Sequence, residues 1–443
     1  MKIKSTLPSL FLGFFCSTSA QFFHGYETDN YSGLHGVVIN PANIADSRVQ
    51  VDVNILSWSA ILANDYLNLS ISSLDELIND DLSGFSTTPS NRNNVAANIS
   101  VLGPSFMFNI NEKHSIGVLT RARMFNTFNN INGQLAEGLF DNFGEDDFSF
   151  NMNDLGATTH VWGEIGLAYG RVIFYDYDKH YVKAGITGKI LLGGGIAQAT
   201  SENLSGNFDP GSNLVALNGT LDYLLSAEST DIRDFASDLS LGLGADLGVI
   251  YELRTPTSRM ADEEDNPRAI NKYRLKVGLS VLDLGRITYD QRNLSRFDLN
   301  GSVNADALES DFQQALRNNF QEQEIPGEVR VSLPTSMNLN IDYKIIPKVF
   351  ANLNVNQTLV KKDSPFNNNR LNQITFTPRF ESRTFSVYLP IANSELAGTT
   401  IGAGLKIGPS IIGSSTVLSN LISEEARALN ISFGFKIPVN HRR

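Results

Sequence analysis

The sequence predicts an all-β protein, an antiparallel transmembrane β-barrel of about 14 strands with some helical loops. Three observations predict this fold. Apolar residues alternate strictly with polar residues or glycine in many segments, which places them on one face of a strand. The better segments have about 9–13 residues, enough to cross a bilayer when tilted. Their opposite face carries Asn, Asp, Ser, Lys and Gly, which suits a hydrated lumen.

The alternation is clearest at residues 239–249, 337–343 and 429–437, which include Leu241, Leu339 and Phe433. Weaker copies occupy residues 49–55, 165–169, 182–192, 273–281, 349–355 and 401–407. A soluble sandwich with its apolar face inward would show the same period and is the alternative. In hydrocarbon, crossing strands must close into a barrel because every backbone polar group has to be paired. At about 12 residues per strand, the wall would take about 170 residues and leave over half the chain for loops or a plug.

Aromatic residues near the ends of these segments are typical of the girdle that such barrels place at headgroup level. We expect this position for Trp58, Trp162, Tyr169, Tyr175, Tyr181, Tyr251, Tyr273, Tyr343, Phe350 and Tyr388.

Composition excludes several other classes of protein. The chain has 443 residues, of which 42% are apolar, too many for a disordered chain. Its 47 acidic residues against 35 Lys and Arg speak against a nucleic-acid partner, which needs a basic footprint. The single cysteine excludes a disulfide scaffold.

Residues 1–20 are predicted to be a signal peptide. Lys2 and Lys4 precede an apolar stretch, and the small residues Thr18 and Ala20 favour cleavage before Gln21. A buried N-terminal helix and a lipid anchor at Cys16 are the alternatives, but bulky Phe15 before the cysteine disfavours the anchor. We therefore expect export to the cell outer membrane.

The segments between strands suggest three helices and no chemistry. Helical spacing of apolar residues appears at 73–82, 306–323 and 418–428. The acidic clusters at 145–147 and 262–265 lack the spacing of a calcium loop, and the histidines form no ligand pair at helical spacing. The glycines at 193–195 are expected to close a strand and not to bind phosphate. We predict no metal, no cofactor and no enzymatic activity.

The segment 32–48, SGLHGVVINPANIADSR, leads directly into the first predicted strand. It resembles the N-terminus of the fatty-acid transporter (FadL-like) family, and more closely a Bacteroidota barrel group, domain of unknown function 5723. Residues 386–390, the run from Gly398 and the closing residues 435–438 fit the same group. The resemblance covers essentially the whole chain after the signal peptide.

The resemblance implies a barrel at 49–443 and an N-terminal hatch at 21–48, with Asn40, Pro41 and Ala42 folded into or under the lumen. A simple turn before the first strand is the alternative for these three residues. In that family the hatch blocks the pore, and hydrophobic substrates leave sideways through the wall. The sequence departs from the family in showing no identifiable ligand pocket or kinked strand, and it ends without a terminal aromatic residue.

Two functions follow as expectations. The first is an outer-membrane barrel that binds or passes small hydrophobic compounds through a hatch-gated lumen, with membrane lipid and the ligand as its partners. The second is a barrel without transport activity that docks onto proteins of a type IX secretion or gliding system. A transporter should show a connected apolar path to an opening near Asn40–Ala42, and a docking protein a filled lumen. The ligand-binding residues stay unassigned.

Overall fold

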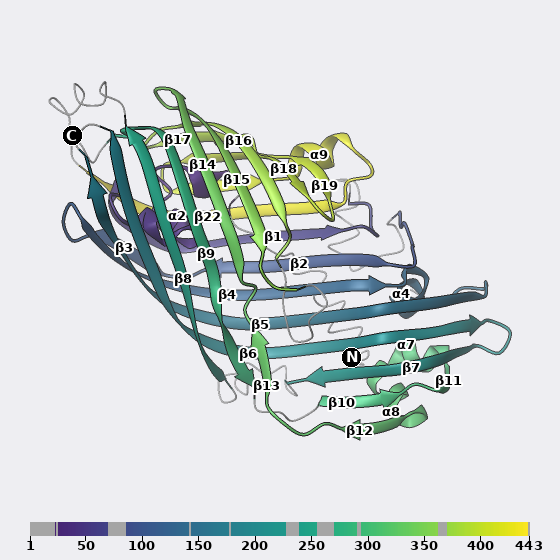
Figure 1. Cartoon of the computed structure of the whole chain (residues 1–443). Coiled ribbons are helices and arrows are strands. Elements are labelled where there is room, and N and C mark those ends of the chain that lie inside the picture. The colour runs from purple at the N-terminus through teal and green to yellow at the C-terminus, as the bar shows by residue number, and fades with distance from the viewer. Residues whose placement is uncertain are drawn as a thin grey trace.

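The protein is a closed antiparallel β-barrel of 14 strands, as a computed structural model shows (Figure 1). The structure describes residues 23, 25–69, 86–140, 143–176, 179–226, 239–254, 270–289, 294–361 and 370–441. The barrel closes where β1 (Val49–Asn64) pairs with β22 (Ala428–Asn440), from Val49 opposite Asn440 to Ala63 opposite Ala428. The predicted fold class and strand number are confirmed.

Some wall strands are interrupted. Their two pieces count as one strand of the wall, because both pair with the same neighbouring strand or with its two pieces. After β1, the wall consists of β2 (Asn93–Leu102) with β3 (Ser105–Asn109), β4 (His114–Ile131), β5 (Phe148–Tyr175), β6 (His180–Asp209), β8 (Ser240–Arg254), β9 (Tyr273–Tyr289), β14 (Ser336–Ile346), β15 (Val349–Thr358), β16 (Gln373–Glu381), β17 (Phe385–Tyr388) with β18 (Ile391–Ser394), β19 (Gly398–Ile401) with β20 (Ala403–Ile407), β21 (Ser410–Ser414) and β22.

The sheet continues beyond the barrel in a part that we call the extension, because β5, with 28 residues, and β6, with 30, run on past the wall. Past Gly193, the partner of β6 changes from β8 to β7 (Leu214–Leu225). The sheet then continues through β10 (Leu294–Asp298), β11 (Gly301–Asn304) and β12 (Gln321–Glu324), while β13 (Val329–Ser332) pairs with β9. The expected strand end at 193–195 is wrong, because the chain stays in β6 while its neighbour changes.

Helices α4 (Gly133–Phe140), α7 (Ala305–Ser310) and α8 (Phe312–Asn319) belong to the extension. The helix expected over 306–323 is two helices, since Asp311 leaves helical geometry and caps α8 through the amide of Gln314 at 3.0 Å. The third expected helix is shorter than predicted, at α9 (Val417–Ile422). The segments 73–82 and 262–265 lie outside the described residues. No helix in the described ranges is long and apolar enough to cross a membrane.

The apolar face of the wall points outward. On β8, Leu241 and Leu243 are 68% and 74% exposed, whereas Asp246 on the other face is buried. On β22, Phe433 is exposed and Lys436 is buried. The alternative of a dry centre between two sheets is therefore overturned, because the buried face is the polar one. Strands account for 66% of the structure. Part of this strand content lies outside the wall, in the extension, where the sequence led us to expect loops or a plug.

The predicted aromatic girdle is only partly right. Tyr169, Tyr175 and Tyr343 are exposed on the outer face. Five others point inward and are buried: Trp162, Tyr181, Tyr273, Phe350 and Tyr388. Proximity to a strand end did not distinguish the two faces.

Candidate functional site

The N-terminal segment lies inside the barrel and is buried there. It forms η1 (Tyr26–Thr28), α2 (Leu34–Ile39) and η2 (Pro41–Ile44), three short helical turns. Gly33 precedes α2 with a φ of 57°, and a side chain there would collide with Asp52 of β1. The Asp52 carboxylate instead accepts a hydrogen bond from the amide of Leu34 at 2.9 Å, which satisfies the start of the helix.

Asn40, Pro41 and Ala42 form the turn that seats this segment on the wall. The Asn40 side-chain oxygen accepts from the amide of Ala42 at 3.0 Å, and Pro41 occupies the first helical position, a standard N-terminal arrangement. The Asn40 side-chain amide donates to the backbone oxygens of Val249 and Leu279, both at 3.3 Å. Asn40 thus contacts β8 and β9 directly.

A row of inward-facing glycines makes room for η2. Gly170 of β5 lies opposite Gly185 of β6, which lies opposite Gly248 of β8. A Cβ atom would collide with Ile44 at Gly170, with Pro41 at Gly185 and with Asn40 at Gly248. Sequence reasoning missed this row. Its signal is glycine at inward positions of three successive wall strands.

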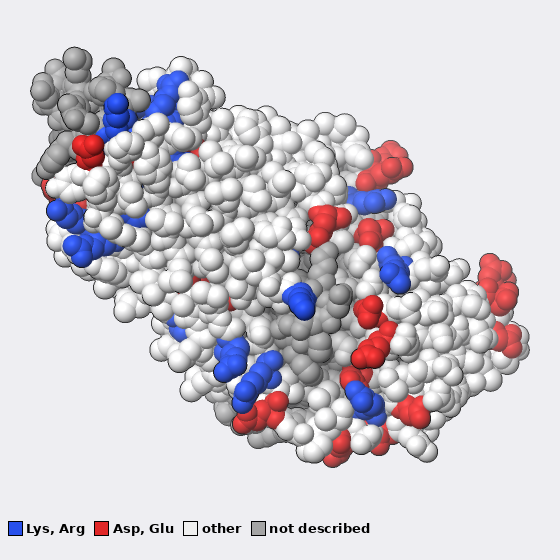
Figure 2. Space-filling model, viewed as in Figure 1, with Lys and Arg blue, Asp and Glu red and all other residues white. Residues whose placement is uncertain are grey.

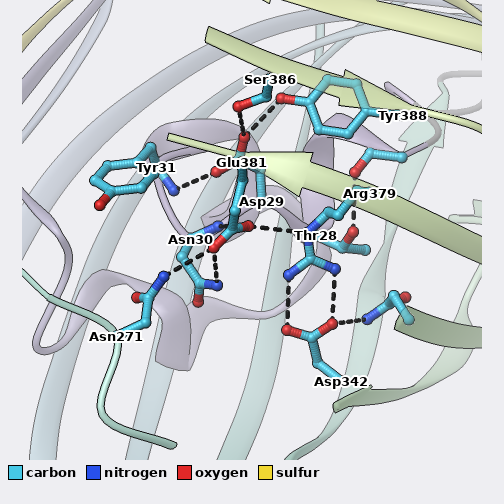
Figure 3. A network of polar contacts seen from close by, with 12 residues as sticks. Thr28, Asp29, Asn30, Tyr31, Asn271, Asp342, Arg379, Glu381, Ser386 and Tyr388 are labelled. Carbon is cyan, nitrogen blue, oxygen red and sulfur yellow. Dashed lines mark hydrogen bonds and ion pairs between the residues drawn. The ribbon is translucent and has the colours of Figure 1, made fainter. Parts of the chain in front are cut away.

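Buried polar contacts hold the segment against the opposite wall (Figure 3). Asp29 accepts hydrogen bonds from Ser386 at 2.8 Å and Tyr388 at 2.6 Å, and Lys406 lies 3.4 Å away. The side-chain amide of Asn30 donates to Glu381 at 2.6 Å. Because these partners lie on β16, β17 and β20, the segment is tied to strands far from η2.

The carboxylate that holds Asn30 belongs to a larger buried network. Arg379 donates to both oxygens of Asp342, at 2.6 and 2.7 Å, and to Glu381 at 2.9 Å. On the β22 side, Lys436 donates to the backbone oxygens of Tyr31 and Ser32, each at 2.9 Å. The segment therefore has polar anchors around the lumen.

Two acidic residues of η1 and its flank differ in their protonation. Burial raises the pKa of Glu27 to about 8, and Arg370 only partly offsets this; the Oε2 atom of Glu27 has no hydrogen-bond partner among the described residues. Burial would also raise the pKa of Asp29, but Lys406 and the Tyr388 hydroxyl outweigh it and hold that pKa below its ordinary value. Near neutral pH, Asp29 is an anchor and Glu27 is largely protonated.

The segment also makes apolar contacts with the wall. Leu34, Val37 and Ile44 pack with Leu102 of β2 and Met107 of β3, among other buried apolar residues. These two strands are interrupted between Leu102 and Ser105, where the sequence is Gly103-Pro104. Proline has no backbone N–H to donate to the strand ladder, which explains the break. The break lies beside the apolar side of the N-terminal segment.

A layer of buried ion pairs crosses the lumen between the N-terminal segment and the extension. We call it the ionic layer, and its members are Arg121, Arg123, Glu164, Lys189, Asp246, Asp283 and Arg370. Asp283 is its centre, 2.8 Å from both Arg123 and Lys189 and paired with Arg370. These residues come from β4, β5, β6, β8 and β9 and from the segment before β16. The lumen is therefore filled, and no apolar path through it reaches Asn40–Ala42 among the described residues.

An apolar cavity lies within the extension. Its volume is about 130 Å³, and every lining side chain is Ile, Leu, Val, Met, Ala or Phe. Leu135 comes from α4, Met152 from β5, Val215 from β7, and Leu308 and Phe312 from α7 and α8. No local pattern in the sequence marks this cavity, because its walls come from segments up to about 180 residues apart along the chain.

The other candidate groups are metal ligands and histidines. Within the described ranges, no group of His, Cys, Asp or Glu side chains could hold a metal ion. On the outer face, His114 and His180 lie 2.7 and 2.8 Å from the hydroxyls of Tyr169 and Tyr251.

The strand pairing defines the class of this protein, a closed 14-strand barrel with an apolar outer face and an N-terminal segment inside it. The chain belongs to the family described as "Family of unknown function (DUF5723)", which it matches over residues 41–414. This confirms the resemblance seen in the sequence. No curated protein matches the sequence.

Solved structures of similar shape are hydrocarbon channels and a FadL homologue. The toluene transporter TbuX of Ralstonia pickettii is 10% identical, with a TM-score of 0.44 over 93% of this chain and 95% of that one. The toluene transporter TodX of Pseudomonas putida is 8% identical, with a TM-score of 0.42 over 95% and 94%. A FadL homologue of Pseudomonas aeruginosa is 10% identical, with a TM-score of 0.40 over 98% and 96%.

Proposed function

We propose that this protein is an integral outer-membrane barrel that binds small hydrophobic compounds in the cavity of the extension and passes them to the membrane. The observation that carries the proposal is that cavity, a space of ligand size that is lined by apolar side chains alone. The outward apolar face supports the membrane, because closed barrels satisfy their backbone in lipid.

Short turns support an orientation in which the N-terminal segment faces the periplasm. The turns between β14 and β15 and between β20 and β21 are two residues long and lie at the end of the barrel that holds this segment. Bacterial barrels place such turns in the periplasm and their longer loops outside. The cavity then faces the cell exterior, on the side from which a compound would arrive.

Residues 21–48, with Asn40, Pro41 and Ala42 at their seat, are proposed to act as the hatch. The position of this segment and of the ionic layer inside the lumen supports this role, because both lie across the route that ions would take. Among the described residues, the apolar path expected of a transporter is missing, and the filled lumen is the feature expected of a docking protein. The apolar cavity of the extension is the observation that favours hydrophobic ligands over docking onto a secretion or gliding system.

The test is uptake of radiolabelled toluene into lipid vesicles containing the protein, combined with single-channel conductance. Deleting Asn40–Ala42 is expected to raise ion conductance and to change toluene uptake, because the seat of the hatch is lost. The control is Gly188→Ala on β6, where an added methyl group meets nothing within 4 Å. Unchanged conductance and uptake in the deletion variant would contradict a hatch.

A further inference from the structure

We infer that the cavity of the extension takes neutral hydrophobic compounds about the size of one aromatic ring and rejects their carboxylate analogues. This inference rests on the function proposed above and names the class of ligand. Three observations carry it: the lining of the cavity, its volume, and the charge of the elements that build it.

The lining offers nothing to pair with a charge. All the side chains that face the cavity are aliphatic, aromatic or thioether groups. Apart from Leu299, whose amide donates to Gly219, these residues belong to strands and helices that pair internally. An ionised carboxylate moved into such a space loses its hydration without gaining a partner. A neutral hydrocarbon loses only unfavourable contact with water.

The volume sets the size of the ligand. The cavity measures about 130 Å³, and an engineered apolar cavity of about 150 Å³ lined by similar side chains binds benzene. A single ring therefore matches the space, whereas a long acyl chain would leave most of its length outside.

The charge of the extension acts against anions even before they reach the cavity. Figure 2 shows Asp and Glu side chains along the end of the molecule that carries the extension, at the right of the view. In residues 131–155, 196–226 and 294–330, the described cations are Arg296, Arg317 and Arg330, each within 3.4 Å of a carboxylate. The described acids there are Glu137, Glu145, Asp146, Asp147, Asp154, Glu202, Asp209, Asp222, Asp298, Asp306, Glu309, Asp311, Glu322, Glu324 and Glu328. Such an excess of one sign repels ligands of the same sign.

The experiment is ¹⁹F NMR of 4-fluorotoluene and 4-fluorobenzoate with the full-length protein in lipid nanodiscs at neutral pH, with empty nanodiscs as the blank. We expect 4-fluorotoluene to bind at least tenfold more tightly than 4-fluorobenzoate. Equal binding of the two would overturn the inference and leave the proposed function standing. If neither they nor hexane nor a long-chain alcohol binds, the proposed function itself falls.

A variant locates the binding. Ala199→Phe on β6 fills the cavity and is expected to weaken 4-fluorotoluene binding at least tenfold. Ala216→Phe is the matched control, because Ala216 of β7 lies between Val215 and Leu217, which line the cavity, and so faces the other side of the sheet. If Ala199→Phe does not fold, Ala136→Leu on α4 tests the same space. Wild-type affinity in a folded cavity variant would overturn the assignment of the ligand to this cavity.

Discussion

Replacing Asp283 with Asn is expected to destabilise the barrel strongly, because it removes the central charge of the ionic layer. Asn keeps the size of the side chain and tolerates the φ of 58° found at this position, so the change is one of charge. Removing one partner of a buried ion pair costs about 3–5 kcal/mol. Since Arg123 retains Glu164 and Lys189 retains Asp246, we expect about 3 kcal/mol, near the lower end of that range.

The measurement is the free energy of unfolding in urea for the protein in lipid vesicles, followed by tryptophan fluorescence. Trp162 reports on this region, since its indole donates to Glu164 of the ionic layer at 2.8 Å. The matched control is Asp222→Asn, which removes a carboxylate paired with Arg296 at 2.6 Å in an exposed position. Exposed pairs contribute about 1 kcal/mol or less. An equal loss of unfolding free energy in the two variants would refute the reasoning that burial makes the ionic layer important for stability.

Two further predictions concern the N-terminal segment. Gly248→Ala is expected to displace Asn40 and to expose the segment to limited proteolysis, whereas Gly188→Ala leaves it protected; equal digestion of the two variants would contradict the seat described here. Glu27 has a pKa of about 8 in the folded protein against 4.5 ordinarily, so the folded state holds the extra proton and stability falls as pH rises from 4.5 to about 8. Glu27→Gln is expected to remove up to about 5 kcal/mol of this pH dependence, measured by urea unfolding across the range. A parallel loss of stability in wild type and variant would show that another group titrates.

The architecture was predictable because it depends on a local pattern. At 337–343, each alternate residue is polar, and the structure turns Asn338, Asn340 and Asp342 into the lumen while Met337 and Tyr343 face outward. A period of two determines the faces of a strand without knowledge of its neighbours. The harder step was to predict what the apolar face contacts, because a soluble sandwich has the same period. The polar and charged residues on the opposite face favoured contact with lipid.

The interior could not be predicted in the same way, because its contacts join distant residues. Arg123 and Asp283 are 160 positions apart, and Asp29 and Tyr388 are 359 apart. Trp162 was assigned to the girdle because of its place near a strand end, although it shares the inward face with Glu164 two residues on. The glycines at 170, 185 and 248 did carry a usable signal, since an inward position without a side chain marks close approach by another part of the chain.

The position of the ionic layer determines which way a bound compound can leave the cavity. Below the cavity lies an apolar cluster with Phe125 and Trp162, and Arg123 stacks on both rings at 4.9 Å. To continue down the lumen, a neutral compound would have to separate Arg123 from Glu164 and Asp283, and each buried pair broken costs about 3–5 kcal/mol. An apolar compound forms no ion pair or hydrogen bond with the separated charges, so this free-energy cost is not offset. A path between apolar side chains and into the surrounding lipid breaks no ion pair. The filled lumen is thus compatible with the proposed transport only if the compound moves sideways. On that proposal, the ionic layer and the proposed hatch stay in place while a hydrophobic ligand leaves through the wall.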